Sequence, residues 1–476
     1  MNVLAIDQGT SSTKAFVVSP DGAVLGEAEM PVRPVATADG GVEQDPEELW
    51  ESVLSSGRKA IAEAGQPVGA LGLANQGETV LVWDRATGRP LSAAMNWQDR
   101  RAALVCDRLR GKAGDLEEIT GLPLDPYFVA PKITWLRENV TTEGVATTSD
   151  TWLLNRLCGA FVTDAATASR WLLLDLDRAE WSPAACEAFG IDPSSLPEPV
   201  SCAGLVGETE AFGGRLPVTG LVVDQQAALF GERCIEAGEA KCTYGTGAFL
   251  LATVGSRPVR SRSGLAGCVA WRLGDTVTYC LDGQVYTVGS AVSWLTEIGL
   301  IGGPADLDAL GGSVSSPEGV SFVPGLAGLA APFWKPAARG GFIGLSLAST
   351  RAHLVRAVVE GIAAGVAWLA KAVEADLGRP LERLRVDGGL TRSRLLMQIQ
   401  ADLLGIPVEV YSSPNATGLG AAAFARLGSG AVTTLEEAIG RWTPATVFEP
   451  SVSTDEARSR LENWRRRAEA MVGLSD

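Results

Sequence analysis

Histidine is almost absent from this chain of 476 residues, in which His353 is the one example. A Ser-His-Asp triad, acid–base catalysis by histidine and most zinc sites are therefore excluded unless that single residue serves. His353 lies within Ser349–Leu354, a stretch that reads as the start of a helix. A structural role is the better interpretation of this residue.

The sequence also lacks the patterns that mark secreted, redox and membrane proteins. Its eight cysteines include no C-x-x-C pair, and no basic segment precedes the acid at Asp7. No uninterrupted apolar run approaches the length of a membrane span. We therefore expect reduced, mostly buried thiols and a cytoplasmic protein with no membrane partner.

Basic residues are fewer than acidic ones, since 40 Lys and Arg stand against 56 Asp and Glu and give a formal net charge of −16. A chain with this charge needs a strong local basic patch to bind nucleic acid through its phosphates. The densest group of arginines, within 458–467, is interspersed with Glu462, which favours a solvated helix face. We expect no nucleic-acid partner.

The composition that is present belongs to a large folded protein. Apolar residues make up 46% of the chain, and its 55 Gly and 25 Pro are near ordinary usage, which excludes a disordered, collagenous or coiled-coil chain. The length predicts two domains or one unusually large one.

Strand patterns and helix patterns alternate along the chain. Val3–Ile6 and Ala15–Val18 are apolar runs on either side of a polar Gly-Thr turn, which predicts a hairpin. Asp45, followed by Pro46 and two acids, predicts a helix that runs to about Ala64. This interleaving of strands and helices favours an α/β fold.

A second hairpin with a Gly-Thr turn, Ala240–Val254, appears half a chain later. The recurrence predicts duplicated domains with a boundary just after Gly231, which gives domains of residues 1–231 and 232–476. Gly, Ser, Pro and Asp dominate Gly302–Gly319, and we expect this stretch to be the least ordered.

Polyphosphate binding by a Walker A loop is excluded, because the sequence has no G-x-x-x-x-G-K-[ST] motif. Three glycine-containing turns after strands offer another route, since glycine lets backbone N–H groups approach phosphate oxygens. They are Asp7–Thr10, Tyr244–Gly247 and Asp387–Gly389, and each taken alone is also ordinary turn chemistry. Asp7 could hold Mg²⁺ through water, and Lys14 could neutralise phosphate charge.

A dinucleotide-binding motif is the alternative for one glycine pair near the C-terminus. Gly418, Gly420 and Ala423 fit G-x-G-x-x-A at the start of a predicted helix. No convincing strand with an acidic residue follows, so close helix packing through small residues is the better interpretation.

Asp224 follows the apolar run Leu221–Val223, where a strand ends and a helix begins. A carboxylate at the carboxyl end of a strand faces the crevice in which α/β sheets place their chemistry. Asp224 could therefore accept a proton from an attacking hydroxyl in phosphoryl transfer. A helix N-cap is an equally good interpretation of this segment alone.

Polar residues around a tryptophan suggest a site for a polyol. Glu78 follows another predicted strand, and Trp97, Gln98 and Asp99 come shortly after it. Acids accept hydroxyl protons and an indole covers a C–H face, so these four side chains could form a polyol pocket. The alternative for Trp97 alone is an ordinary core position.

Taken together, these segments resemble the FGGY carbohydrate kinases, and among them most closely the glycerol kinases. The likeness covers nearly the whole chain, in order. The matching segments are Asp7–Thr10, Asn75–Glu78, Trp97–Arg101, Asp125–Phe128, Asp150–Leu153, Asp224–Gly231, Thr243–Gly247, Val386–Gly389 and Gly418.

The resemblance implies an α/β fold of two actin-like, RNase H-type ATPase domains on either side of a deep catalytic cleft. It implies an acceptor-binding domain of residues 1–231, a nucleotide-binding domain of 232–476, and transfer of the γ-phosphate of ATP, with Mg²⁺, to a terminal hydroxyl of a polyol or ketose. A homodimer or homotetramer is also implied. The implied residues are Asp224 as general base; Glu78, Trp97, Tyr127, Asp224, Gln225 and Phe249 for the acceptor; Thr10, Ser11, Lys14, Thr246, Gly289 and Gly388 for ATP; and Asp7 for the metal.

Two positions depart from the glycerol kinase pattern. Gly77 stands where glycerol kinases carry an arginine that donates several hydrogen bonds to the acceptor, so glycerol binding should weaken and space should open for a different polyol. Ser393 and Arg394 stand where asparagine is usual, which affects adenine contacts. The open alternatives are a kinase of erythritol, a pentitol, ribulose or xylulose, an actin-like ATP switch without sugar kinase activity, and an inactive sensor.

Overall fold

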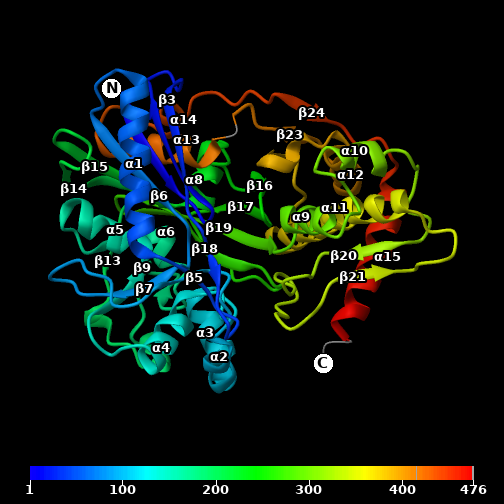
Figure 1. Ribbon diagram of the computed structural model, residues 1–476, viewed down its shortest axis with the longest axis horizontal. Coiled ribbons are helices and arrows are strands. Elements are labelled where there is room, and N and C mark those ends of the chain that lie inside the picture. Colours follow the sequence, from blue (N-terminus) through cyan, green and yellow to red (C-terminus); the bar gives the residue numbers. More distant parts are fainter. Residues whose placement is uncertain (414, 474–476) are drawn as a thin grey trace.

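The computed structural model describes residues 1–413 and 415–473, and two large sheets organise the two halves of the chain (Figure 1). The first sheet has the order β14-β15-β6-β1-β2-β3. Its strands are β1 (Val3–Gln8), β2 (Ser12–Val18), β3 (Val24–Pro31), β6 (Ala70–Asn75), β14 (Ala203–Thr209) and β15 (Leu216–Val223). β1, β6 and β15 are parallel, so their carboxyl ends share one edge of the sheet.

The N-terminal hairpin and the first helix are confirmed. β1 and β2 pair antiparallel, with Asp7 opposite Lys14. Helix α1 (Pro46–Ala64) begins after Asp45, whose side chain accepts a hydrogen bond from the backbone N–H of Glu47 at 2.9 Å. Its buried face packs on β1, β2 and β3 and covers one side of the sheet.

A smaller layer lies beside the first sheet and carries much of the chain from 35 to 200 (Figure 1). One five-stranded sheet of order β4-β5-β8-β7-β9 belongs to it. Its elements are β4 (Val35–Ala36), β5 (Val42–Gln44), β7 (Val80–Trp83), β8 (Ala94–Met95), α2 (Ala103–Leu109), α3 (Ala113–Thr120), α4 (Val129–Asn139), β9 (Val145–Thr148), α5 (Ser149–Cys158), β10 (Val162–Asp164), α6 (Ala165–Ala168), β11 (Leu174–Asp175), β12 (Glu180–Trp181), α7 (Pro183–Phe189) and β13 (Glu198–Val200).

The second large sheet has the order β18-β19-β17-β16-β22-β23-β24. Its strands are β16 (Ala240–Tyr244), β17 (Ala248–Gly255), β18 (Ala266–Leu273), β19 (Thr276–Val285), β22 (Leu384–Asp387), β23 (Val408–Val410) and β24 (Thr446–Phe448). β16 and β17 form the second predicted hairpin, which is therefore confirmed. β16 also runs parallel to β22, so the Gly-Thr turn at 245–246 and the turn at Gly388 lie next to each other.

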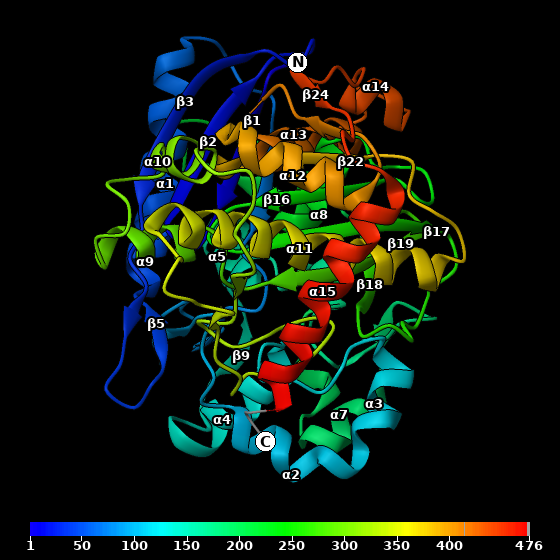
Figure 2. The ribbon, with the colours of Figure 1, turned by 90° about the vertical axis from the view of Figure 1, so that its right-hand side faces the viewer.

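Two helices, α11 (Arg351–Leu377) and α12 (Arg394–Leu404), cover the outer face of the second sheet, and α15 (Thr454–Gly473) packs across them (Figure 2). By length and composition alone, α11 could span a membrane, whereas the sequence predicts no apolar run of that length. Most of its apolar stretch is buried inside the protein. His353 caps this helix, because its Nδ1 accepts the backbone N–H of Thr350 at 3.1 Å. The structural interpretation of the histidine is confirmed.

The stretch Gly302–Gly319 is more regular than its composition predicts. It contains α10 (Asp306–Gly311), which packs against α11 and α12, and α9 (Gly289–Glu297) precedes it. Asp308 of α10 accepts hydrogen bonds from the Ser393 hydroxyl and from the backbone N–H of Arg394. This tertiary contact orders a stretch whose composition suggests a loop.

Helix α13 (Ala416–Gly428) joins the two halves, because it comes late in the chain but packs against the first sheet and α8 (Asp224–Gly231). Phe424 stacks on Phe230 with ring centroids 4.3 Å apart. A Cβ atom on Gly420 would lie 1.9 Å from the carbonyl oxygen of Ala227. The small residues of this helix therefore serve close packing, and the dinucleotide-binding alternative has no support here.

Candidate active site

A cavity of about 210 Å³ lies between the two halves of the chain, at the carboxyl edge of the first sheet. This is below the ~300–1,000 Å³ typical of sites for drug-sized ligands, so the cavity has room for a small molecule. The residues that line it are Thr10, Ser11, Gln76, Gly77, Glu78, Trp97, Tyr127, Arg170, Val223, Asp224, Gln225, Gln226, Thr243, Gly245, Thr246, Phe249 and Asp282. All six residues expected at the acceptor are therefore brought to one cavity.

Asp224 stands at the carboxyl end of β15, as the first residue of α8. The N-cap position belongs to Val223, and the Asp224 carboxylate accepts the N–H of the next residue, Gln225, at 2.6 Å. The N-cap interpretation is therefore wrong. The Asp224 side chain is partly exposed to the cavity. Desolvation nevertheless raises the pKa of its carboxyl group to about 7, and the negative charges of Asp7 and Glu78 add to this increase.

Glu78 is held in the cavity wall by a strained backbone and an ion pair. Its φ is +58°, a left-handed conformation that side chains other than glycine rarely adopt. Its Oε1 accepts the Nε–H of Arg170 at 2.6 Å, and both side chains are about 95% buried. Among the described residues, no hydrogen bond joins the second carboxylate oxygen of Glu78 to the protein, so this oxygen is available to a ligand hydroxyl in the cavity.

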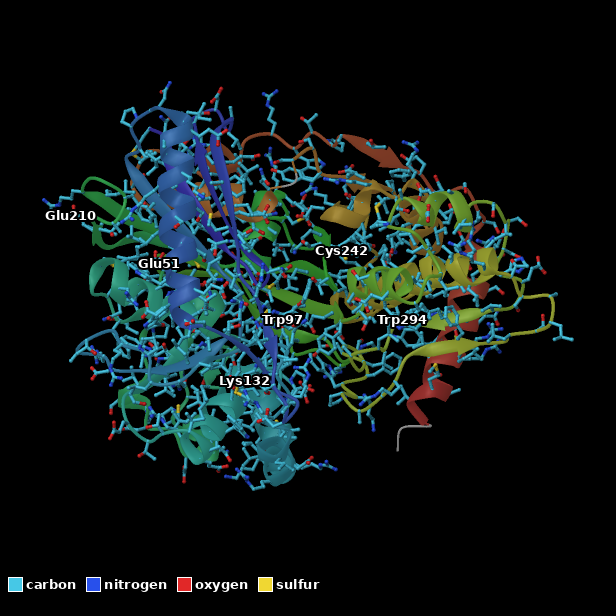
Figure 3. All side chains as sticks on the ribbon, viewed as in Figure 1. Glu51, Trp97, Lys132, Glu210, Cys242 and Trp294 are labelled. Atoms are coloured by element: carbon cyan, nitrogen blue, oxygen red, sulfur yellow. The ribbon has the colours of Figure 1, made fainter. Side chains whose placement is uncertain are left out.

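Three aromatic rings form one wall of the cavity. The ring of Trp97 lies edge-on to Tyr127 and to Phe249, each with centroids 6.0 Å apart. Its Nε1 donates to the hydroxyl of Thr10 at 2.7 Å, which ties the aromatic wall to the first Gly-Thr turn. Figure 3 shows Trp97 between the two halves of the molecule, with Lys132 below it.

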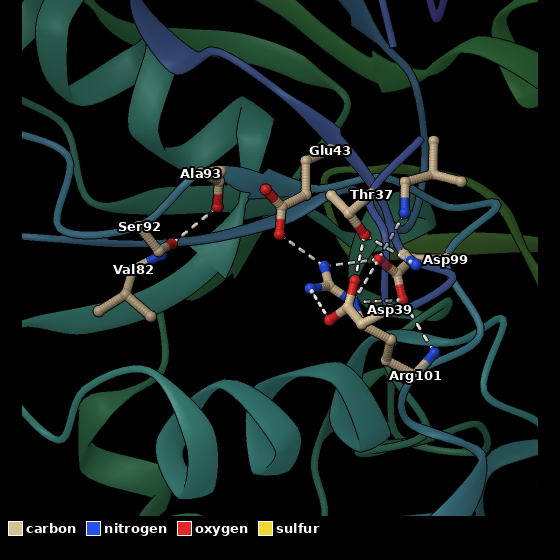
Figure 4. Close-up of polar contacts among 10 residues, drawn as sticks. Thr37, Asp39, Glu43, Val82, Ser92, Ala93, Asp99 and Arg101 are labelled. Atoms are coloured by element: carbon tan, nitrogen blue, oxygen red, sulfur yellow. Dashed lines mark hydrogen bonds and ion pairs between the residues drawn. The ribbon is translucent and has the colours of Figure 1, made fainter. Parts of the chain in front are cut away.

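The loop that carries Trp97 is braced by a charged cluster (Figure 4). Asp99 is fully buried. Its carboxylate accepts hydrogen bonds from the backbone N–H of Val42 at 2.8 Å and from Nε and Nη2 of Arg101. Arg101 also pairs with Glu43 at 2.7 Å. Neither Gln98 nor Asp99 lines the cavity, so the predicted polyol pocket is corrected to Glu78 and Trp97 without these two.

A second cavity, of about 930 Å³, adjoins the first and shares Gly245 and Thr246 with it. Its size suits a nucleotide. Trp294 of α9 lies beside it (Figure 3), and Gly289, Ser293, Asp308, Gly389 and Ser393 are among its other lining residues. Thr246 and Gly289 of the expected ATP site thus lie on its wall, whereas Thr10 and Ser11 line the smaller cavity.

Two of the expected ATP residues line neither cavity. Gly388 is packed under the Gly-Thr turn, where an added Cβ would lie 2.5 Å from the carbonyl oxygen of Tyr244, and its neighbour Gly389 is the residue on the wall. Lys14 on β2 lies opposite Asp7 on β1 in the antiparallel pairing of these strands. Its charge acts on Asp7 rather than forming part of the cavity wall.

The carboxylates near the two Gly-Thr turns suit one magnesium ion. Burial raises the pKa of Asp7 to about 6, with further increases from Asp387 and Glu29, and Asp7 in turn raises the pKa of Asp224. Oδ1 of Asp387 is buried and has no hydrogen-bond partner within residues 1–413 and 415–473. No group of three metal-ligating side chains occurs among the described residues. These residues fit Mg²⁺, which keeps several waters and is held by one or two carboxylates together with substrate phosphates.

Three charged residues of the site were not predicted from the sequence. Arg170 and Asp282 line the small cavity and pair with each other at 2.8 Å. Lys241 is fully buried and donates to the side chain of Gln225 at 2.7 Å. A charged residue inside a run of strand residues, as at 241 and 282, is the signal that could have found them, because such a residue must have a buried partner.

Comparison with known proteins places these features in context. The models of the N-terminal and C-terminal domains of the FGGY family of carbohydrate kinases match residues 2–231 and 240–428. The chain is 42% identical to glycerol kinases of Bordetella parapertussis and Thermus brockianus, over 99% of its length and 97% and 98% of theirs.

Solved structures show the same fold. Glycerol kinase of Plasmodium falciparum with ADP superposes with a TM-score of 0.90 at 32% identity, covering 99% of this chain and 98% of that one. Xylulose kinase of Lactobacillus acidophilus also gives a TM-score of 0.90, at 20% identity, with 100% and 98% covered. The pair of large sheets is thus an arrangement that this chain has in common with sugar kinase structures.

Proposed function

Since the chain belongs to the FGGY family of carbohydrate kinases and is an ATP-dependent phosphotransferase with an alcohol acceptor, we propose that it phosphorylates a terminal hydroxyl of glycerol or a related polyol. The observation that carries this proposal is the position of Asp224. Its carboxylate lies in a small polar cavity beside Glu78 and next to the Gly-Thr turn of the larger cavity.

In the proposed reaction, Asp224 accepts the proton of the acceptor hydroxyl as that oxygen attacks the γ-phosphorus of ATP in line, and the bond from this phosphorus to the bridging oxygen breaks and releases ADP. Glu78 and the aromatic wall hold the acceptor in the orientation this attack requires. Backbone N–H groups of the Gly-Thr turns stabilise the charge on the transferred group. Closure of the two halves excludes water, which favours transfer over hydrolysis.

We propose that Asp7, with Asp387 near it, holds the magnesium ion through water. Bound Mg²⁺ supplies charge neutralisation at the phosphates. Thr246 and Gly289 would contact the nucleotide on the wall of the larger cavity, and Gly388 would shape the turn that supports it.

We also propose a division of labour between residues 1–231, which would bind the acceptor, and 232–476, which would bind ATP. This division is supported by the two large sheets, because the first contains strands up to Val223 and the second contains strands from Ala240 onward. We propose a cytoplasmic homodimer or homotetramer whose partners are small molecules, without a nucleic-acid or membrane partner, in keeping with the net charge of −16 and the buried side of α11.

The test of the proposed function is the variant Asp224→Asn in a coupled assay of ADP release. We expect kcat to fall by about 10²–10⁴-fold with saturating acceptor, since a general base contributes about that factor. The fold should remain intact, as checked by circular dichroism. Near-normal turnover by this variant would contradict the role of Asp224.

A kinase of a longer acceptor is a second candidate, favoured by Gly77. This residue offers no side-chain donor, and a Cβ at this position would lie 3.1 Å from Cγ2 of Val223. An actin-like switch would instead show ATP consumption that no polyol or ketose stimulates. An ADP-release screen across glycerol, erythritol, pentitols, ribulose, xylulose and dihydroxyacetone separates these candidates.

A further inference from the structure

Four buried amide side chains form one hydrogen-bonded network beside the small cavity. They belong to Gln8, Gln44, Gln76 and Asn96, and each is at most 1% exposed. Gln8 and Gln44 are the last residues of β1 and β5, and Gln76 and Asn96 directly follow β6 and β8. The network therefore joins the ends of four strands, two from the first large sheet and two from the five-stranded sheet.

Gln44 is the centre of this amide network. Its Nε2 donates to the carbonyl oxygen of Thr10 at 2.9 Å. Its Oε1 accepts hydrogen bonds from Nε2 of Gln76 at 2.9 Å and from Nδ2 of Asn96 at 2.8 Å, so both lone pairs of this oxygen are used. Nε2 of Gln76 also lies 3.4 Å from Oε1 of Gln8, which adds the fourth amide.

Backbone groups at two ends of the network fix the orientation of the amides between them. A carbonyl oxygen can only accept, so Nε2 of Gln44 must face Thr10. A backbone N–H can only donate, and that of Gln98 meets Oδ1 of Asn96 at 3.0 Å, which turns Nδ2 of Asn96 toward Gln44. The amides therefore have one favourable orientation, and a fully satisfied buried network of this kind is rigid.

The segments that the network joins carry the wall of the small cavity. Thr10 lines this cavity in the first Gly-Thr turn, and its hydroxyl accepts a hydrogen bond from Nε1 of Trp97 at 2.7 Å. Trp97 directly follows Asn96, and Glu78 comes two residues after Gln76. The amide network thus fixes the first Gly-Thr turn relative to the pocket glutamate and the aromatic wall.

We propose that Gln44 is a positioning residue for phosphoryl transfer. It lines neither cavity, so it acts through the groups that it holds. By fixing Thr10 and the loop of Trp97, it keeps the phosphate-binding turn and the acceptor wall at the separation that in-line attack requires. A shift of about 1 Å between reacting groups can lower the rate by about 10²-fold. This inference rests on the proposed kinase function and adds a residue to it.

The experiment compares the wild type with Gln44→Met in the coupled assay of ADP release. Methionine is about as long as glutamine but makes none of the three hydrogen bonds. We expect kcat per folded molecule to fall by about ten-fold or more with saturating acceptor and ATP. The KM for ATP should stay within about three-fold, because the amide network does not line the larger cavity. Urea unfolding and circular dichroism give the folded fraction.

A double-mutant cycle with Trp97→Phe tests whether Gln44 acts through the turn. Phenylalanine keeps an aromatic ring but lacks the Nε1 donor to Thr10. If both residues hold the same turn, the double variant should lose less activity than the product of the two single losses. If Gln44→Met does not fold, Gln44→Asn serves in its place, because it keeps an amide that is too short to reach all three partners. It should lower kcat in the same direction.

Thr147→Val is the matched control. Thr147 of β9 is fully buried and lines neither cavity; its hydroxyl accepts a hydrogen bond from Nε1 of Trp83 at 2.9 Å and donates to the carbonyl oxygen of Thr148 at 3.0 Å. Valine keeps the shape and removes both bonds. We expect this variant to lose stability, as Gln44→Met does, and to keep the kcat of the wild type.

The outcomes separate this inference from the kinase proposal. A wild type that phosphorylates no polyol or ketose would overturn both. A wild type that is active, together with a folded Gln44→Met variant of unchanged kcat, would overturn only the inference, since the network would then serve stability alone. Losses that simply multiply in the double-mutant cycle would also overturn it, because Gln44 would then not act through Thr10 and Trp97.

Discussion

At the scale of single residues, the ionisation of Asp224 sets the conditions under which it can act. Its pKa is raised from 3.8 to about 7, chiefly by desolvation. A carboxylic acid cannot accept a proton, so only the fraction that is ionised can serve as a base. The environment that isolates this carboxylate for phosphoryl transfer also makes its charge costly to the folded protein.

This raised pKa predicts a specific dependence of stability on pH in the metal-free protein. Between about pH 4 and pH 7 the folded state keeps a proton on Asp224 that the unfolded state has released, so the free energy of unfolding should fall as pH rises through this range. Urea unfolding at several pH values measures it. The dependence should be weaker in Asp224→Asn, although other buried carboxylates with a raised pKa, such as Asp7 and Asp164, still contribute; identical pH profiles would contradict the raised pKa of Asp224.

Gly77 and Val223 are neighbours in the wall of the small cavity, and substitutions at the two positions can separate the gain of hydrogen-bond donors from the loss of space. An arginine at 77 would add donors to the cavity, but its Cβ would crowd the methyl group of Val223, 3.1 Å away.

We predict that Gly77→Arg combined with Val223→Ala raises kcat/KM for glycerol by about ten-fold, whereas Gly77→Arg alone gives a smaller gain. Steady-state kinetics of both single variants and the double variant form the complete cycle. Purely additive effects would show that the two positions do not compete for space.

At the scale of elements, helix α13 is held against α8 at a distance that only glycine permits. A Cβ on Gly420 would lie 1.9 Å from the carbonyl oxygen of Ala227, which is backbone and cannot move independently. Since α8 begins at Asp224, this helix contact also supports the segment that carries the proposed base. Packing far from the cavity thus influences the position of the carboxylate.

We predict that Gly420→Ala lowers the free energy of unfolding by about 1–3 kcal/mol or more, because the added methyl group overpacks the contact. Gly114→Ala is the control: Gly114 lies within helix α3 and a Cβ there meets nothing within 4 Å, so stability should stay equal or increase. Chemical denaturation of both variants measures the difference. Equal stabilities would show that α13 can shift at little cost.

At the scale of the whole molecule, the two cavities meet at the Gly-Thr turn of 245 and 246, so acceptor and nucleotide sites share one wall. Their ligands nevertheless depend on different groups. The small cavity, proposed to bind the acceptor, is lined by Glu78, Arg170 and aromatic rings, whereas the metal is proposed to lie at Asp7 and the phosphates.

We therefore predict that removal of Mg²⁺ with EDTA abolishes phosphoryl transfer but leaves acceptor binding within about three-fold, since the acceptor contacts require no metal. Isothermal titration calorimetry of the acceptor that the screen selects, with and without EDTA, measures binding. Added Mg²⁺ should restore turnover. Loss of acceptor binding in EDTA would place the metal within the acceptor site.

The sequence by itself determined the hairpins at both Gly-Thr turns, helix α1 and a structural role for His353 at the start of a helix, because glycine turns, caps and apolar spacing act over a few neighbouring residues. It also indicated the family, and it singled out Glu78, Trp97 and Asp224. The prediction that Asp99 belongs to the polyol pocket is wrong, because closeness in sequence does not fix where a side chain points. Asp99 lies two residues from Trp97, yet it binds Arg101 and braces the loop.

Only the tertiary structure decided which charges meet. Arg170 and Asp282 are more than a hundred residues apart, and they form a pair only because the two halves close on each other. The order of α10 likewise comes from contacts with α11 and α12. Such contacts depend on the packing of distant surfaces, which no local pattern encodes, and for this reason the Arg170–Asp282 pair emerged only from the fold.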